Sequence, residues 1–301
     1  MSNLIPVDIP RMAEPPVSRL APTPSGFLHL GNAVNFLVTW ALVRRYNGRL
    51  HLRIDDMDGI RFRRDVLEDI FASLDWLGLD WDTGPEGPDE FLRHFSLQDR
   101  REIYRSHLAR LNGAGGCIFN CGCSRKDIRR VSADGRYPRT CRDSRCEFIP
   151  GRSAVRLKVD GDSRIKVNST AIDLEQAMGD FVVWRKDDQP SYHLASLVED
   201  ESSGINFIVR GEDLLESTAA QIYLAGCLGF SNFPRIRFIH HGLVTGADGK
   251  KLSKSRGAFA LKDMRASGSG PEKAFRAAAR LLGIPGEGIS APGDLVARLR
   301  S

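Results

Sequence analysis

The sequence has no run of about 18 apolar residues, so it contains no segment with the length and hydrophobicity of a membrane-spanning helix. Its beginning, MSNLIPVDIPRMAEPPVS, lacks the apolar core of a secretory signal, and we expect a flexible leader over 1–17. It also lacks internal repeats and a strong charge imbalance, because the net charge is only +5. These absences lead us to expect a cytoplasmic protein without a membrane partner.

Apolar spacing predicts helices that alternate with strands. Residues 33–47 and 64–79 have the period of a helix, and between them Leu50, Leu52 and Ile54 alternate as in a strand that ends in three carboxylates. We expect further helices over about 97–112, 192–204 and 271–283, and strands over 154–159, 181–186 and 235–246. Residues 205–229 are predicted to be a buried strand and then a helix. This order is typical of an α/β domain with a parallel sheet.

Cysteines are concentrated in one part of the chain. Five of the six lie between 117 and 146, and two of them form a Cys-Gly-Cys pair. Because no export signal precedes them, this clustering favours a metal site over disulfides. The alternative is that they are reduced cysteines of the core.

Two short segments suit phosphate chemistry. FLHLGN, residues 27–32, brings a histidine and a glycine to the start of a predicted helix, where backbone N–H groups hold anions well. KKLSKS, residues 250–255, alternates lysines with hydroxyl residues in a glycine-flanked loop. Taken singly, the first also fits a turn with a surface histidine, and the second a solvated basic loop.

The two segments together resemble the paired signatures of the class I aminoacyl-tRNA synthetases. RLAPTPSGFLHLGNA followed by LRIDDMD resembles the catalytic domain of the glutamyl-tRNA synthetases, and the resemblance runs from about residue 18 to 260. It implies a Rossmann-like catalytic domain over 18–240, then a KMSKS-like loop and a short helical C-terminal segment over 241–301. It also implies that ATP, with Mg²⁺, activates L-glutamate to a glutamyl-adenylate.

The resemblance also implies roles for single residues. Those expected to bind glutamate are Arg19, Leu20, Ala21, Pro22, Thr23, Asp55, Tyr192 and Arg210. Those expected to bind ATP are His29, Gly31, Asn32, Lys251, Ser253 and Lys254, of which His29, Asn32 and Lys254 are the catalytic set. Asp55 stands where the family usually has glutamate, so we expect that the backbone lies closer, or that Asp56 or a water shares its task. Asn32 replaces the second histidine of the usual signature, a common variant among the glutamate enzymes.

The chain after residue 255 is too short for the helical anticodon-binding domains of the full-length enzymes, so we expect no such domain. The sequence therefore resembles a short paralogous group, which attaches glutamate to the queuosine base in the anticodon of tRNA(Asp) and activates glutamate without tRNA. That group also has a zinc segment, matched here by an insert over 105–150. Its ligands for one structural Zn²⁺ are implied to be Cys121, Cys123, Tyr137 and Cys141, with Cys146 as a rival.

Several alternatives stay open at this stage. Basic residues around 125–145 fit contact with RNA phosphates as well as they fit a solvated face. The chain could instead charge a tRNA 3′ end with anticodon recognition from a partner, or act as a non-catalytic regulator. We expect a monomer whose substrates are ATP, L-glutamate and tRNA(Asp) bearing queuosine.

Overall fold

The structure is a computed structural model that describes residues 6–9, 11–113, 116–144, 146–161, 163–242 and 260–300. The chain divides into two compact units. The first contains the described residues of 1–97, 205–213 and 236–301, and the second those of 98–204 and 214–235. Within these described ranges, no helix is both long enough and apolar enough to cross a bilayer.

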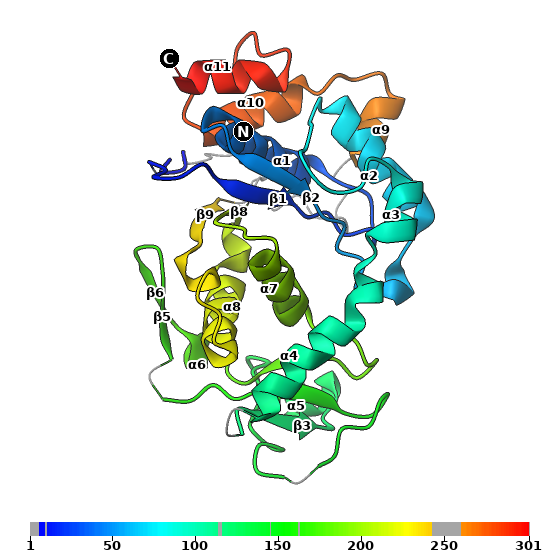
Figure 1. Ribbon diagram of the computed structural model, residues 1–301, viewed down its shortest axis with the longest axis vertical. Helices are drawn as coiled ribbons and strands as arrows, with labels where there is room; N and C mark the ends of the chain where they lie inside the picture. The colour runs from blue at the N-terminus through cyan, green and yellow to red at the C-terminus, as the bar shows by residue number, and fades with distance from the viewer. Residues whose placement is uncertain are drawn as a thin grey trace. The chain divides into compact units, whose positions relative to one another are not determined.

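Two parallel strand pairs form the centre of the first unit. Strand β1 (Val17–Leu20) pairs with β2 (Arg49–Leu52), and β8 (Phe207–Gly211) pairs with β9 (Arg237–His241). The N–H of Asn206 donates to the carbonyl of Val17 at 3.0 Å, which joins the two pairs at the start of β1 and β8. The predicted parallel α/β arrangement is confirmed (Figure 1).

Helix α1 (Leu30–Arg45) connects β1 to β2 and is buried on both sides. Eleven of its sixteen residues are buried, because the strands β1, β2 and β8 cover one face while α10 (Glu272–Leu281) and α11 (Pro292–Arg300) cover the other (Figure 1). A helix enclosed in this way is apolar around its whole circumference. The predicted C-terminal helical segment therefore completes the core around α1.

The other helices of the first unit flank this core. They are the 3₁₀ turn η1 (Gly59–Arg61), α2 (Arg64–Trp76), α3 (Pro88–His94) and α9 (Leu261–Ala266). One side of α2 buries Val66, Leu67, Ile70 and Leu74, as its apolar period predicts. Arg265 of α9 pairs with the buried Asp69 of α2, which anchors α9 to α2.

The second unit combines an antiparallel sheet with helices. Its sheet has the order β3 (Ile118–Cys121), β4 (Ala154–Leu157) and β7 (Phe181–Trp184), beside a hairpin of β5 (Arg164–Val167) and β6 (Thr170–Asp173). Its helices are α4 (Arg101–Gly113), α6 (Leu174–Ala177), α7 (Tyr192–Ser202) and α8 (Leu215–Leu228). The chain passes from one unit to the other at or next to three 3₁₀ turns: η2 (Leu97–Arg100), η3 (Glu212–Leu214) and η4 (Phe233–Arg235). The buried carboxylate of Glu199 on α7 accepts hydrogen bonds from Arg100 and Tyr104, which ties α4 to α7.

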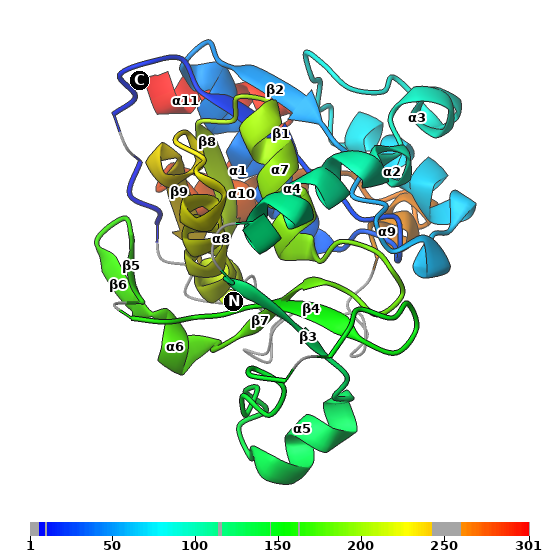
Figure 2. The same cartoon turned by 60° about the horizontal axis from the view of Figure 1, so that its bottom comes forward.

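The cysteine-rich part of the second unit has a small core of its own. Helix α5 (Arg125–Val131) and its adjoining loops lie beyond the end of β3 (Figure 2). Phe119, Cys121, Ile128 and Tyr137 are buried together there, with Cys123 and Cys141 packed against them. Residues 105–113 of the predicted 105–150 insert are part of α4. The predicted domain boundaries stay predictions.

Candidate active site and metal centre

His29 is the N-cap of α1 and is held by a reciprocal pair of hydrogen bonds. The N–H of Gly31 donates to Nδ1 of His29 at 3.1 Å, and the N–H of His29 donates to the side-chain oxygen of Asn32 at 3.0 Å. Because Nδ1 acts as an acceptor, the neutral imidazole carries its proton on Nε2. His29 therefore presents an Nε2–H donor at the positive end of the helix dipole, which suits a phosphate oxygen.

Gly31 suits this cap because the ring of His29 lies very close to it. A Cβ at position 31 would lie 3.0 Å from Cε1 and 3.1 Å from Nδ1 of His29, tighter than nearly all real Cβ contacts. The glycine of the HLGN segment thus leaves room for the histidine ring to fold back over the first turn.

The two chain segments that flank the predicted KMSKS-like loop both meet the start of α1. Ala260 forms a β-bridge with His29, and the N–H of Leu261 donates to the carbonyl of Leu28 at 2.8 Å. On the other side, His241 lies 3.0 Å from the side-chain oxygen of Asn35 on α1. Lys251, Ser253 and Lys254 lie outside the described residues.

Two buried arginines lie on neighbouring strands of the first unit. Arg19 on β1 is 8% exposed, and Arg210 on β8 is 3% exposed. The Arg210 guanidinium lies over the ring of Phe238, 5.4 Å from its centroid. Buried guanidinium groups favour an anionic partner, and their forked geometry matches a carboxylate. The structure places these two predicted glutamate-binding residues in the first unit, on the adjacent parallel strand pairs β1–β2 and β8–β9.

Asp55 follows β2 and is fixed by a neighbour that sequence reasoning missed. Arg53 donates through Nε to one carboxylate oxygen of Asp55 at 2.6 Å and through Nη2 to the other at 3.3 Å. In extended chain, side chains two residues apart point to the same side. The spacing of Arg53 and Asp55 is therefore the signal that could have revealed the pair. Asp56, in contrast, is buried and accepts hydrogen bonds from Ser96 and from the N–H of Leu97. Asp56 therefore links the segment after β2 to Ser96 and Leu97, and the alternative in which it shares the task of Asp55 stays a prediction.

The remaining predicted glutamate-binding residues differ in exposure. The side chains of Leu20 and Pro22 are buried, and their carbonyls accept hydrogen bonds from the N–H groups of Arg53 and Asp55. Ala21 is half-buried, and Thr23 is exposed. Tyr192, 42% exposed, begins α7 in the second unit. Leu20 and Pro22 thus position the loop after β1 through their backbone.

His240 is a second residue that sequence reasoning missed. It stands opposite Arg210 in the register of the parallel strands β8 and β9. Burial, followed by the charge of Arg210, lowers the pKa of His240 to about 4. The ring is therefore neutral at physiological pH beside one of the buried arginines. The consecutive histidines 240 and 241 at the end of a predicted strand were the available signal.

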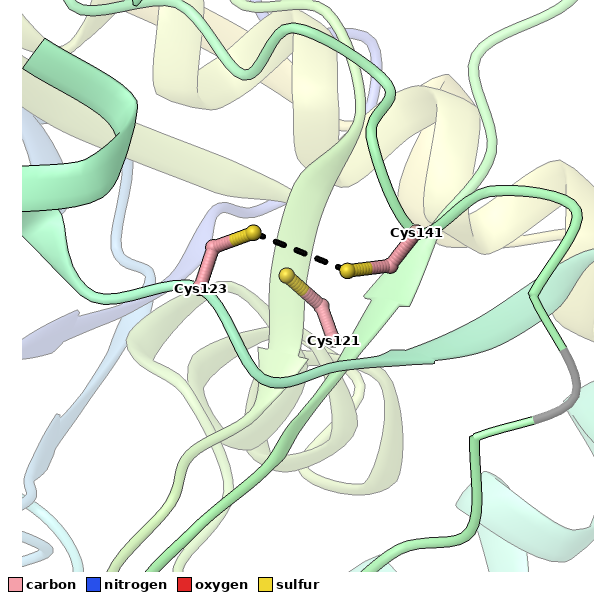
Figure 3. A group of neighbouring side chains, drawn as sticks. All are labelled: Cys121, Cys123 and Cys141. Atoms are coloured by element: carbon pink, nitrogen blue, oxygen red, sulfur yellow. Dashed lines mark hydrogen bonds between the residues drawn. The ribbon is translucent and has the colours of Figure 1, made fainter. Parts of the chain in front are cut away.

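Three cysteine thiols converge in the second unit. The sulfurs of Cys121, Cys123 and Cys141 all lie within 4.8 Å of one another, and those of Cys123 and Cys141 are 3.6 Å apart (Figure 3). Tetrahedral zinc with Zn–S bonds of about 2.3 Å separates its sulfurs by about 3.8 Å, whereas a disulfide has an S–S bond of about 2.05 Å. The cluster has the spacing of a metal site, and the donor set suits Zn²⁺.

Tyr137 lies against this cluster, and Cys146 does not. The Tyr137 oxygen accepts a hydrogen bond from the N–H of Cys141 at 2.7 Å, and burial, then hydrogen bonds with the Cys121 and Cys141 thiols, raises its pKa. Cys146 is exposed, its sulfur accepts a hydrogen bond from Ser144, and it is not part of the three-cysteine group among the described residues. The geometry favours Tyr137 over Cys146 as a fourth ligand.

The pKa values of two of these thiols are shifted in opposite directions. Burial, together with the Cys141 thiol, raises the pKa of Cys123 to about 12. Burial also opposes ionisation of Cys141, but hydrogen bonds from Tyr137 and Cys123 outweigh it and leave the pKa of Cys141 below its ordinary value. Metal binding at such a cluster releases protons, because thiolates are the ligands.

Comparison with known proteins identifies the family. Residues 17–291 match the family of class I tRNA synthetases (E and Q), catalytic domain. The glutamyl-Q tRNA(Asp) synthetase of Symbiobacterium thermophilum is 39% identical over 285 residues, which cover 88% of this chain and 86% of that protein. The chain belongs to the class I tRNA synthetases (E and Q), in their glutamyl-Q tRNA(Asp) synthetase branch. It is therefore an enzyme of the ligase class.

The longer relatives contain additional chain. Glutamate–tRNA ligase 2 of Syntrophus aciditrophicus is 32% identical over 91% of this chain, which spans only 58% of that protein. The glutamate tRNA ligase of Elizabethkingia meningosepticum, solved in complex with its amino acid, superimposes with a TM-score of 0.71 at 20% identity. That match covers 95% of this chain and 64% of the solved one, and it shows the fold alone.

Proposed function

We propose that the protein uses ATP to activate L-glutamate, without tRNA, and then transfers the glutamyl group to the queuosine base in the anticodon of tRNA(Asp). The observation that carries this proposal is the match to a protein named glutamyl-Q tRNA(Asp) synthetase along nearly nine tenths of both chains. The capped His29, the buried arginines and the three-cysteine cluster provide a chemical basis for it.

In the activation step, a glutamate α-carboxylate oxygen attacks the α-phosphorus of ATP, and the bond to the departing pyrophosphate breaks. His29 donates its Nε2–H to an ATP phosphate oxygen, while the N–H of Gly31 holds the ring through Nδ1 and the Asn32 side chain holds the backbone N–H of His29. Lys254, with Lys251 and Ser253, would stabilise the charge of the leaving pyrophosphate. Mg²⁺ that accompanies ATP would neutralise part of that charge. No side chain acts as a nucleophile, so positioning and preorganised charge account for the rate.

The glutamate pocket follows from the charges of the first unit. Arg19 and Arg210 supply cationic groups for a carboxylate, and Asp55 supplies an anionic group for the α-ammonium. Arg53 donates to both oxygens of Asp55 and so fixes this side chain, which is one methylene shorter than the usual glutamate. Tyr192 would complete the contacts to glutamate.

One structural Zn²⁺ would be held by Cys121, Cys123, Cys141 and the oxygen of Tyr137. The metal would supply a cross-link between β3 and the loop that carries Cys141, in a region whose apolar core has only a few side chains. Its role is to fix the conformation of this insert.

Glutamate-dependent exchange of pyrophosphate into ATP, measured without tRNA, tests the first step. Transfer of labelled glutamate is then compared on tRNA(Asp) with and without queuosine. The expected result is label only on the queuosine-containing tRNA, found after nuclease digestion on the anticodon fragment rather than on the 3′-terminal fragment. Equal labelling of both tRNAs would support 3′-end charging, and absence of exchange would support a non-catalytic regulator. We expect the reaction to occur in the cytoplasm. We also expect the enzyme to be a monomer, and gel filtration would check this oligomeric state.

A further inference from the structure

Helix α5 presents a basic face to solvent. Arg125, Lys126, Arg129 and Arg130 are all exposed, and their spacing of i, i+1, i+4 and i+5 puts them on one side of the helix. Ile128 lies on the opposite side and is buried in the small core that contains the cysteine cluster. These four residues, called the α5 basic face, are thus held outward by the packing of the insert.

The other arginines of this region are used differently. Arg136 pairs with Asp134, Arg139 with Glu175, and Arg142 with Asp160, so the charges of these three are compensated within the fold. Among the described residues, no carboxylate forms an ion pair with any member of the α5 basic face. Asp127, the acidic residue of α5, is engaged with the N–H and hydroxyl of its own N-cap, Ser124.

The first turn of α5 carries an electrostatic cost, although Arg129 and Arg130 lie in the last turn, where cations are favourable. Arg125 and Lys126 occupy the first turn of α5, where a cation opposes the helix dipole by about 0.3–1 kcal/mol. Arg125 and Arg129 are four residues apart, as are Lys126 and Arg130, and like charges at this spacing repel. A bound polyanion would remove both penalties.

A pocket of about 360 Å³ next to the end of α5 offers a contrast. Its charged lining residues are Asp134, Arg136, Arg139 and Glu175, which cancel in sign. The net charge of the pocket therefore does not attract a phosphate, whereas the α5 basic face carries four cations that form no ion pair among the described residues. Three of these are arginines, whose guanidinium groups match phosphate geometry.

We propose that the α5 basic face binds the phosphate backbone of the substrate tRNA. This rests on the proposed function, which makes tRNA(Asp) the acceptor of glutamate. The face holds the RNA by charge, without reading its sequence, and so contributes affinity that depends steeply on salt.

The test uses the double variant Arg125→Gln/Lys126→Gln in the full chain. These two positions are chosen because their loss relieves the helix dipole, so α5 is expected to be as stable as before or more so. The matched control is Lys273→Gln/Arg276→Gln, which removes the same charge from two exposed positions of α10. Affinity for tRNA(Asp) bearing queuosine is measured by filter binding between 50 and 200 mM salt, as is usual for such contacts.

We expect the dissociation constant of the α5 variant to rise about tenfold at 0.1 M salt, and the slope of log affinity against log salt to fall by about one to two. The control is expected to match the parent protein in both. Unchanged affinity and slope in the α5 variant, or an equal change in the control, would overturn the proposal. Pyrophosphate exchange by the unaltered protein is measured in parallel: its absence counts against the proposed function, whereas the binding data judge the α5 basic face. Thermal unfolding verifies that each variant is folded.

Discussion

The substitution Gly31→Ala separates the orientation of His29 from the stability of α1. The added Cβ would lie 3.0 Å from Cε1 and 3.1 Å from Nδ1 of the His29 ring. The ring has to move by a few tenths of an ångström or leave its place, which lengthens the hydrogen bond from the N–H of Gly31 to Nδ1. The Nε2–H then no longer points in its original direction.

The expected change in stability is small because two effects oppose each other. Loss of an N-cap bond destabilises by about 1 kcal/mol. Alanine in place of a helical glycine returns about 0.5–1 kcal/mol. Activity has no such compensation, because a displaced donor lowers a rate by about 10². We therefore predict a melting temperature within a few degrees of the parent, with pyrophosphate exchange about a hundredfold slower.

Two further variants make this prediction specific. Gly226→Ala on α8 has nothing within 4 Å of the added Cβ, so it should gain about 0.5–1 kcal/mol and exchange at the parent rate. His29→Asn keeps a favoured N-cap residue but removes the Nε2–H, so it should stay stable while exchange falls by about 10²–10³. Parent-like exchange by Gly31→Ala would refute the reasoning, and so would a loss of several kcal/mol in stability.

Three other predictions concern the metal centre and the pH response. Cys123→Ser should lose bound zinc, measured by elemental analysis, and melt at a lower temperature, whereas Cys146→Ser should retain it; loss of zinc in the latter would restore Cys146 as a ligand. Tyr137→Phe should keep the metal but release it at a lower concentration of chelator. His240 has a folded pKa of about 4 against 6.5 unfolded, so the unfolded state binds the additional proton between these values. Stability should then fall by about 2 kcal/mol as pH drops from 7 to 4, after allowance for partial exposure, and His240→Gln should show a correspondingly flatter denaturation profile; an identical profile would contradict the assignment.

Much of the first unit could be predicted from local patterns. The period of apolar residues predicted a helix over 33–47, and α1 spans Leu30–Arg45. It begins three residues earlier because the two hydrogen bonds of the His29 cap, one from Gly31 and one to Asn32, define its start, and these are side-chain contacts rather than apolar spacing. The parallel sheet was predicted from the alternation of elements and is confirmed.

The site was only partly predictable. Arg19 and Arg210 were named from resemblance, but the pairing of Asp55 with Arg53 and the place of His240 depend on side-chain geometry that no motif contains. The binding roles of these residues, and those of Lys251, Ser253 and Lys254, stay predictions.

The sequence by itself determined the synthetase family, the α/β class and the residue types available for a metal site, because these rest on local spacing and on motifs that tolerate change elsewhere. The tertiary structure alone decided that Tyr137 rather than Cys146 lies against the three thiols, and that Asp56 is engaged inside the fold. It also decided that α5 holds four cations outward, opposite the buried Ile128. These contacts depend on which segments, far apart in the sequence, meet when the core forms. The spacing of residues along the chain does not specify how close such segments come in space.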